Sequence, residues 1–312
     1  MPERTHLYRL ISRNKWGTAG FIFLMSLLLG LLGAGMGAYF GWGWEIYALF
    51  GLGIVLYNVV LYFNSDRIAL AVNGAKPADP IRHRQLHNIV EEVAIAAGLP
   101  RPRVYVMDTM VPNAFATGRK PEKAAIAVTE GLLKMMDREE LQGVVAHEMA
   151  HIRNYDILIM TIVAIIGGLI ILLRDVFLRF GIFFGGGRRR RSSSRGGGQA
   201  GAILAIVGIV LAILAPVLVA LIRSAVSRQR EYLADASGAF IVRNPNGLAS
   251  ALEKLSGTSE KLRTASNATA HMFISSPFAK DRRTSASWFA SHPPLRERVE
   301  RLRQLSLTDS SE

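Results

Sequence analysis

The chain has 312 residues, 37 lysine and arginine against 24 aspartate and glutamate residues, and half of its residues are hydrophobic. A mean hydropathy of +0.24 with 20% charged residues excludes a disordered chain, and the length allows one large or two ordinary cores. Cysteine is absent, which excludes disulfides and thiolate metal sites, so any transition metal must be held by histidine, aspartate and glutamate. Composition predicts a membrane-associated enzyme or transporter.

Two apolar runs lie near the N-terminus, at residues 18–40 and 46–63. Each has about the 20 residues that an α-helix needs to cross the hydrocarbon core of a bilayer. The short connection between them carries Trp42 and Trp44, a residue type that favours the membrane interface. We therefore expect a tight transmembrane hairpin within residues 1–67.

The charges around this hairpin predict its orientation. Its connecting loop carries no lysine or arginine, whereas the segment before it carries Arg4, Arg9, Arg13 and Lys15. The positive-inside rule then places the N-terminus and the chain after Arg67 in the cytoplasm. A cleaved secretory signal peptide is the alternative, but the long apolar run and the immediate second span favour an uncleaved anchor.

Two further apolar runs, residues 157–173 and 200–222, predict a second apolar hairpin over residues 157–222. The loop at 185–198 consists of glycine, arginine and serine, as in flexible exposed loops. If both runs span, its arginines lie outside, against the positive-inside rule. If the hairpin is re-entrant or lies on the surface, they stay inside and can contact anionic lipid. No nucleic acid is expected despite the net charge of +13, because no aromatic or base-reading residue is interleaved with the arginines.

The remaining segments predict helices and a small sheet. Helices are expected at residues 79–99, from Thr129, from Asp137 to about Tyr155, and at 224–239, 247–255 and 294–305. Short strands are expected at residues 103–108 and 124–128, with a weaker third at 113–117. Asp137 followed by Glu140 is typical of a capping box at the start of a helix.

The helix after Asp137 contains His147, Glu148 and His151 in the pattern HEMAH. Histidines four residues apart lie on one face of a helix, so both imidazoles can bind one metal ion. Glu148 lies next to that face, where its carboxylate can reach a metal-bound water. The residues before the motif are largely apolar, which indicates a buried helix and argues against two unrelated surface histidines.

A catalytic zinc site needs a third protein ligand, which must come from elsewhere in the chain. Glu231 and Asp235, four apart on a predicted helix, are the best candidates: one carboxylate can bind the metal while the other hydrogen-bonds a ligand imidazole. They could equally form an ordinary exposed helix face. His292, in a loop before two prolines, is an alternative that lies further along the chain: it could bind the metal or hydrogen-bond a substrate. It could equally well be a plain cap before the last helix.

These motifs together resemble the HtpX-type membrane metallopeptidases, HExxH zinc peptidases (gluzincins) related to the prenyl-protein (CAAX) endopeptidases. The resemblance covers nearly the whole chain and rests on residues 147–156, 230–239, 291–294 and 113–118. It implies that Glu231 is the third ligand of one Zn²⁺ per chain. It also implies a role for Asp235 beside the site and a substrate-facing role for His292.

The predicted fold is that of a mainly α integral membrane protein, with transmembrane helical hairpins and a zincin-like α+β catalytic domain that has a small sheet. The catalytic domain is expected in two parts, residues 68–156 and 223–312. The resemblance implies a zinc endopeptidase of the bacterial inner membrane, multi-pass and facing the cytoplasm, that degrades misfolded membrane proteins in stress response and quality control. The loop at 185–198 matches no motif of that family.

Chain topology constrains the position of the metal. If His151 and Glu231 bind one ion, the chain crosses the membrane an even number of times between them. His151 comes shortly before one apolar run and Glu231 shortly after the next, so the ion is expected at or near the membrane surface, within reach of substrates in the bilayer. The charge of the N-terminal segment places it on the cytoplasmic side.

The expected mechanism uses Glu148 as general base and then as proton donor to the leaving amine, with His292 as a candidate stabiliser of the oxyanion. An extended substrate could pair with an exposed sheet edge, either 124–128 or 113–117, which contains Asn113, Ala114 and Phe115. A membrane scaffold or chaperone with a structural zinc site is the alternative. A transporter is disfavoured, because residues 18–40 and 200–222 contain no ionisable side chain on a transport path.

Overall fold

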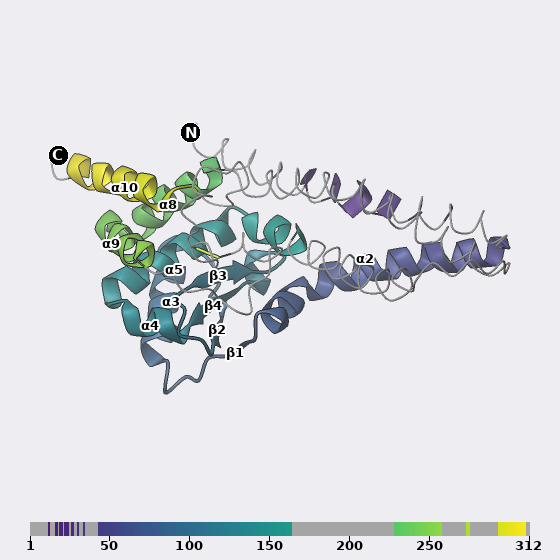
Figure 1. Ribbon diagram of the computed structural model, residues 1–312, viewed down its shortest axis with the longest axis horizontal. Coiled ribbons are helices and arrows are strands. Elements are labelled where there is room, and N and C mark those ends of the chain that lie inside the picture. Colours follow the sequence, from purple (N-terminus) through teal and green to yellow (C-terminus); the bar gives the residue numbers. More distant parts are fainter. Residues whose placement is uncertain are drawn as a thin grey trace, which may run out of the picture.

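The computed structural model describes residues 43–163, 228–257, 273–274 and 293–309, with scattered positions between residues 12 and 34. In these parts a small sheet packs against a group of helices, and one long helix extends away from them (Figure 1). Most of the first predicted span, the second apolar hairpin beyond residue 163 with its loop at 185–198, and His292 lie outside the described residues.

Helix α2, Trp44–Val72, is the long helix, and it contains the second predicted span. Only 6% of its most apolar stretch is buried, and among the described residues it is the one helix long and apolar enough to cross a membrane. It continues unbroken through Arg67, so the boundary expected there lies inside a helix.

Two contacts place part of the first apolar run beside α2. The Asn58 side-chain amide donates to Ser26 Oγ over 2.8 Å, and the Tyr47 hydroxyl donates to the Ala34 carbonyl over 3.5 Å. The earlier residue of the first run contacts the later residue of α2, so the two segments are antiparallel. This arrangement fits a helical hairpin, and its crossing of a membrane stays a prediction.

The last turns of α2 are fixed to the sheet by polar and aromatic contacts. Arg103 donates from Nη2 to the buried carboxylate of Asp66, and the Arg119 guanidinium lies 4.4 Å from the centre of the Phe63 ring. A guanidinium over an aromatic face is attracted by the ring's electron density. The apolar helix is therefore anchored at one end to the body that carries the site.

The sheet has four strands in the order β1-β2-β4-β3. They are β1 (Ala75–Pro77), β2 (Arg103–Met107), β3 (Ala114–Thr117) and β4 (Ala125–Thr129). The three predicted strands are confirmed, whereas β1 was missed because it is only three residues long and ends in proline. β1 and β3 pair antiparallel with their neighbours, and β2 pairs parallel with β4.

The prediction that residues 124–128 could form a sheet edge is wrong. Strand β4 pairs with β2 along one side and with β3 along the other, so its backbone groups are used within the sheet. The outer strand on that side is β3. Sequence could not show this order, because it depends on which short strands meet in space.

Six further α-helices are described from end to end. They are α3 (Arg84–Ala97), α4 (Glu130–Met135), α5 (Arg138–Arg153), α8 (Arg228–Val242), α9 (Pro245–Ser256) and α10 (Leu295–Asp309). Each was predicted, and the caps at Thr129 and Asp137 are both present. The capping box is confirmed: Asp137 accepts from the Glu140 N–H, and the Glu140 carboxylate accepts from the Asp137 N–H.

The start of α3 was predicted five residues too early. Asp79 Oδ1 accepts from the N–H groups of Ile81 and Arg82, which forms a separate turn before the helix. The helix ends at Ala97, two residues before the predicted end, where Gly98 adopts φ +65°, a left-handed conformation that glycine enters without steric cost.

The core lies between the sheet and the helices. Side chains of α3, α5 and α9 share one cluster with Ala114, Ala116 and Ile126. The other face of the sheet carries Phe115, whose ring makes an edge-on contact with Phe273 at 5.4 Å and packs near the end of α2. The site-bearing helix α5 therefore lies in the middle of the body, buried along most of its length.

Candidate metal centre and active site

Helix α5 presents His147, Glu148 and His151, all of which are buried. The capping box fixes the start of this helix, and the carboxylate of Glu140 also accepts from Ser250 Oγ at 2.7 Å on α9. The helix therefore has little freedom to rotate or slide. Its polar motif is held at a defined place inside an otherwise apolar core.

Helix α8 crosses α5 at very short range, and Gly238 makes this possible. A Cβ atom at Gly238 would lie 2.9 Å from the His147 backbone nitrogen and 3.0 Å from the Ala146 carbonyl carbon. Real Cβ atoms are hardly ever found so close to backbone. Because Asp235 and Glu231 lie one and two turns before Gly238 on the same helix face, this contact brings both carboxylates to the histidines.

The structure brings His147, His151 and Glu231 together, with one potential ligand atom from each lying within 4.8 Å of the others. The two Nε2 atoms are 3.2 Å apart. Glu231 approaches His151 Nε2 to 3.5 Å and His147 Nε2 to 4.0 Å. Two nitrogens that each lie about 2.1 Å from a tetrahedral zinc ion are about 3.4 Å apart, so the histidine spacing fits such an ion.

The other nitrogen of each histidine faces a carboxylate. His147 Nδ1 lies 2.9 Å from Asp235 Oδ1, and His151 Nδ1 lies 3.1 Å from Asp156 Oδ2. An Nδ1–H that donates to a carboxylate leaves the lone pair on Nε2, the atom that points to the shared centre. Both imidazoles are therefore oriented as metal ligands are, with Nδ1 toward a carboxylate and Nε2 toward the shared centre.

The charges around the centre also fit a divalent cation. With neutral imidazoles and every carboxylate ionised, four carboxylates and two guanidiniums give a formal charge of −2. These are Glu148, Asp156, Glu231, Asp235, Arg230 and Arg298. Burial lowers the pKa of His151, but Asp156 and Glu231 outweigh it and raise that pKa to about 10. The groups around His151 thus favour a positive charge at the shared centre, to which its Nε2 atom points.

Glu148 is the third polar residue of the motif, and its side chain is buried beside the two histidines. Burial raises the pKa of its carboxyl to about 7, although the cationic neighbours oppose the shift. The Ala116 N–H of strand β3 donates to the same carboxylate. A carboxylate with a pKa near neutrality can both accept a proton from water and return it.

Comparison with known proteins decides the family. The profile of peptidase family M48 matches residues 80–306. The chain belongs to peptidase family M48.

The family relationship extends beyond the matched segment. A protease HtpX homolog of Caldanaerobacter subterraneus is 56% identical over 307 residues, which cover 98% of this chain and all of that protein. A protease HtpX homolog of Thermoanaerobacter pseudethanolicus is 53% identical over 98% of this chain and all of its own length. The solved structure of Ste24p from S. mikatae is 20% identical with a TM-score of 0.47, over 96% of this chain and 67% of that one. This M48 protein is a metalloprotease, and the recognition from the motifs is confirmed.

Arg298 of α10 is the main component of this M48 site that sequence reasoning missed. Its side chain is completely buried, and it donates to both oxygens of Asp235 at 2.7 and 2.8 Å. Its Nη1 lies 3.4 Å from Glu231 Oε2 and donates to the Ile274 carbonyl at 3.0 Å. Burial raises the pKa of Asp235, but Arg298 outweighs it and lowers that pKa to about 2, so this carboxylate stays charged beside His147.

A sequence signal for Arg298 existed. In α10 the apolar residues Leu295, Val299 and Leu302 pack on the core, and Arg298 shares their face. An arginine on the apolar face of an amphipathic helix needs a buried acidic partner. Asp156 was quoted within the family motif, but no role was predicted for it.

The predicted substrate contacts have mixed outcomes. Asn113, Ala114 and Phe115 are all buried: the Asn113 N–H donates to Thr129 Oγ1, and the Phe115 side chain packs under Phe273. The Ala114 carbonyl accepts from the Ile274 N–H at 3.0 Å. Their contact with substrate stays a prediction, as does the role of His292.

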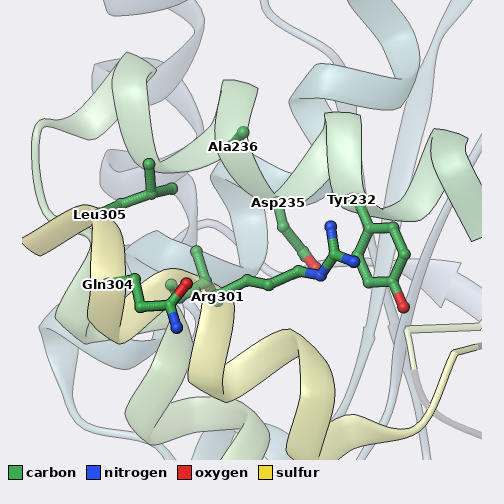
Figure 2. A pocket seen from close by; sticks show the side chains of 7 residues that line it. Tyr232, Asp235, Ala236, Arg301, Gln304 and Leu305 are labelled. Atoms are coloured by element: carbon green, nitrogen blue, oxygen red, sulfur yellow. The ribbon is translucent and has the colours of Figure 1, made fainter.

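A cavity of about 340 Å³ lies between α8 and α10, and Asp235 is the residue it shares with the metal centre. Figure 2 shows the Arg301 side chain reaching toward the Tyr232 ring, with its guanidinium carbon 3.9 Å from the ring centre. Leu302 and Leu305 of α10 supply apolar walls. Tyr232 and Arg301 therefore line this cavity together with Asp235.

We predict that Gly238→Ala weakens metal binding by at least about tenfold, because the added methyl group must push α8 away from α5 and carry Glu231 with it. Metal affinity is measured by competition with a chromophoric chelator. Ala236→Ser, on the exposed face of the same helix, is the control. An unchanged affinity in Gly238→Ala would show that the close crossing does not position the ligand.

Proposed function

We propose that this M48 metalloprotease is a membrane-anchored zinc endopeptidase that cleaves unfolded and membrane-protein substrates at the cytoplasmic membrane face. The observation that carries the proposal is the convergence of His147, His151 and Glu231, with both Nδ1 atoms turned to carboxylates. The donor set contains two imidazoles and one carboxylate and no thiolate, which suits catalytic zinc with one open position.

The three residues would hold a single zinc ion. When bound, it supplies Lewis-acid chemistry that polarises the scissile carbonyl and makes a water nucleophilic near neutral pH. Glu148 accepts the proton of that water and then delivers it to the departing amine. Asp235 and Asp156 keep the ligand histidines in one tautomer, and Arg298 keeps Asp235 charged and in place.

Strand β3 is the proposed docking edge for substrate. It is the outer strand of the sheet, and its Ala116 N–H reaches the Glu148 carboxylate, so this edge passes beside the general base. A peptide that adds a strand there is recognised through its backbone, which predicts loose sequence specificity. Two groups of this edge are already used, the Ala114 carbonyl by Ile274 and the Ala116 N–H by Glu148, which limits docking to the rest of the edge.

The proposed location at the membrane surface rests on α2 and on the chain around the site. The apolar part of α2 is exposed, and its end is anchored to the sheet through Asp66 and Arg103. The predicted second apolar hairpin starts directly after Asp156 and ends shortly before Glu231. A role in quality control in a bacterial inner membrane follows from the resemblance to the HtpX-type peptidases.

We predict that Glu148→Gln retains stoichiometric zinc but loses cleavage of an unfolded protein by about 10²- to 10⁴-fold, because an amide cannot accept the proton of water. His147→Ala should lose both zinc and cleavage. Cleavage is measured with detergent-purified protein, stripped with chelator and then given zinc. If Glu148→Gln cleaves at nearly the wild-type rate, the mechanism is wrong, and if wild type binds zinc without cleaving, the scaffold alternative takes its place.

The orientation can be tested because the chain has no cysteine. We expect a membrane-impermeant thiol reagent to label Glu91→Cys, on exposed α3, only from the cytoplasmic side. Trp44→Cys, at the exposed start of α2, should be labelled only from the opposite side. The unsubstituted chain provides the background. Labelling of Glu91→Cys in intact cells would contradict a cytoplasmic site.

A further inference from the structure

Each ligand histidine is supported by its own pair of aspartate and arginine. His147 contacts Asp235, which is bound by Arg298 from α10. His151 contacts Asp156, and Arg230 of α8 lies 3.5 Å from the other carboxylate oxygen of Asp156. In the first pair Arg298 is completely buried and makes two hydrogen bonds to the carboxylate, whereas the second pair is held by one longer contact.

A left-handed turn after α5 places Asp156 next to His151. Helix α5 ends at Arg153, and Tyr155 then adopts φ +59°, a left-handed conformation that is uncommon for a residue other than glycine. This reversal places the Asp156 side chain beside the helix it has just left. A strained turn that delivers one side chain to a functional group indicates that the contact matters.

Asp156 and Arg230 also stand at the two ends of the predicted second apolar hairpin. Asp156 directly precedes residue 157, where the first apolar run begins, and Arg230 follows the second run and precedes Glu231. Their side chains are 4% and 11% exposed, so the ion pair is largely shielded from water. Removal of one partner of such a pair leaves a buried charge uncompensated.

We propose that Asp156 and Arg230 form a clasp that positions His151 for zinc. Asp156 fixes the imidazole directly, and Arg230 acts through Asp156 by holding its carboxylate against Nδ1. The same ion pair joins two residues that flank the predicted second apolar hairpin, so both flanks of that segment and one zinc ligand are tied together. Both are positioning residues. The proposal rests on the proposed zinc site.

The test measures the rate of zinc release from the full-length protein in detergent, with a chromophoric chelator as acceptor. We expect Asp156→Ala to speed release by about 10- to 100-fold, since loss of such an outer partner of a ligand histidine weakens binding by that factor. Asp156→Asn, which keeps an acceptor of nearly the same shape, should fall between Asp156→Ala and wild type. It also replaces Asp156→Ala if that variant fails to fold.

The role of Arg230 is tested by asking whether the effect of its substitution on zinc release requires Asp156. Arg230→Gln should speed release by about fivefold in the wild-type background and by less than about twofold in the Asp156→Ala background, since it acts through that carboxylate. Arg230→Lys should restore most of the slow release. Arg228→Gln, an exposed cation on the first turn of the same helix, should stay within about twofold of wild type.

Two results would overturn the clasp. One is an equal effect of Arg230→Gln in both backgrounds, which would show that Arg230 acts independently of Asp156. The other is unchanged zinc release in Asp156→Ala with a lower melting temperature of the zinc-free protein, which would make the contact merely structural. Either result leaves the peptidase proposal standing if wild type binds zinc and cleaves, whereas a wild type that binds no zinc contradicts that proposal itself.

Discussion

A buried carboxylate needs a compensating positive charge, and four buried carboxylates lie around the two histidines where α5 and α8 cross. Two guanidiniums leave the group short of neutrality by two charges, which one divalent cation supplies. The close approach at Gly238 creates this arrangement, because it lets the carboxylates of α8 reach the imidazoles of α5. The fold around the crossing, from the capping box to the core of the sheet, holds these two helices in place.

The two histidines are supported from different directions. Arg298 comes from the C-terminal helix and is enclosed by the core, where it binds Asp235 with two short hydrogen bonds. Arg230 and Asp156 come from the chain segments that flank the predicted membrane hairpin, and their contact is longer. His147 is therefore supported from the core between the sheet and the helices. His151 is supported from the part of the chain that would meet lipid.

Sequence patterns predicted the features set by neighbouring residues, but they did not determine which distant residues meet at the site. Helix caps such as Asp137 with Glu140, and the histidine pair four residues apart, are set by neighbours within one or two turns, so they were predicted correctly. The meeting of Glu231 with the histidines was one of several possibilities from spacing alone, and the family resemblance favoured it.

The features that were missed depend on the tertiary arrangement. The central position of β4, the three-residue strand β1 and the burial of Arg298 arise from contacts between segments far apart in the chain. The α3 start was misjudged because Asp79 caps a turn as readily as a helix. Asp156 was overlooked because its role depends on the left-handed turn at Tyr155, which no residue type announces.

X-ray absorption at the zinc edge of the purified, zinc-loaded protein tests the proposed ligand set directly. We predict a first shell of nitrogen and oxygen only, at about 2.0–2.2 Å, with the signature of two imidazoles. His151→Ala should remove one imidazole from that signature or abolish binding. A zinc shell that keeps both imidazoles in His151→Ala, or that contains no imidazole in wild type, would contradict the proposed ligand set.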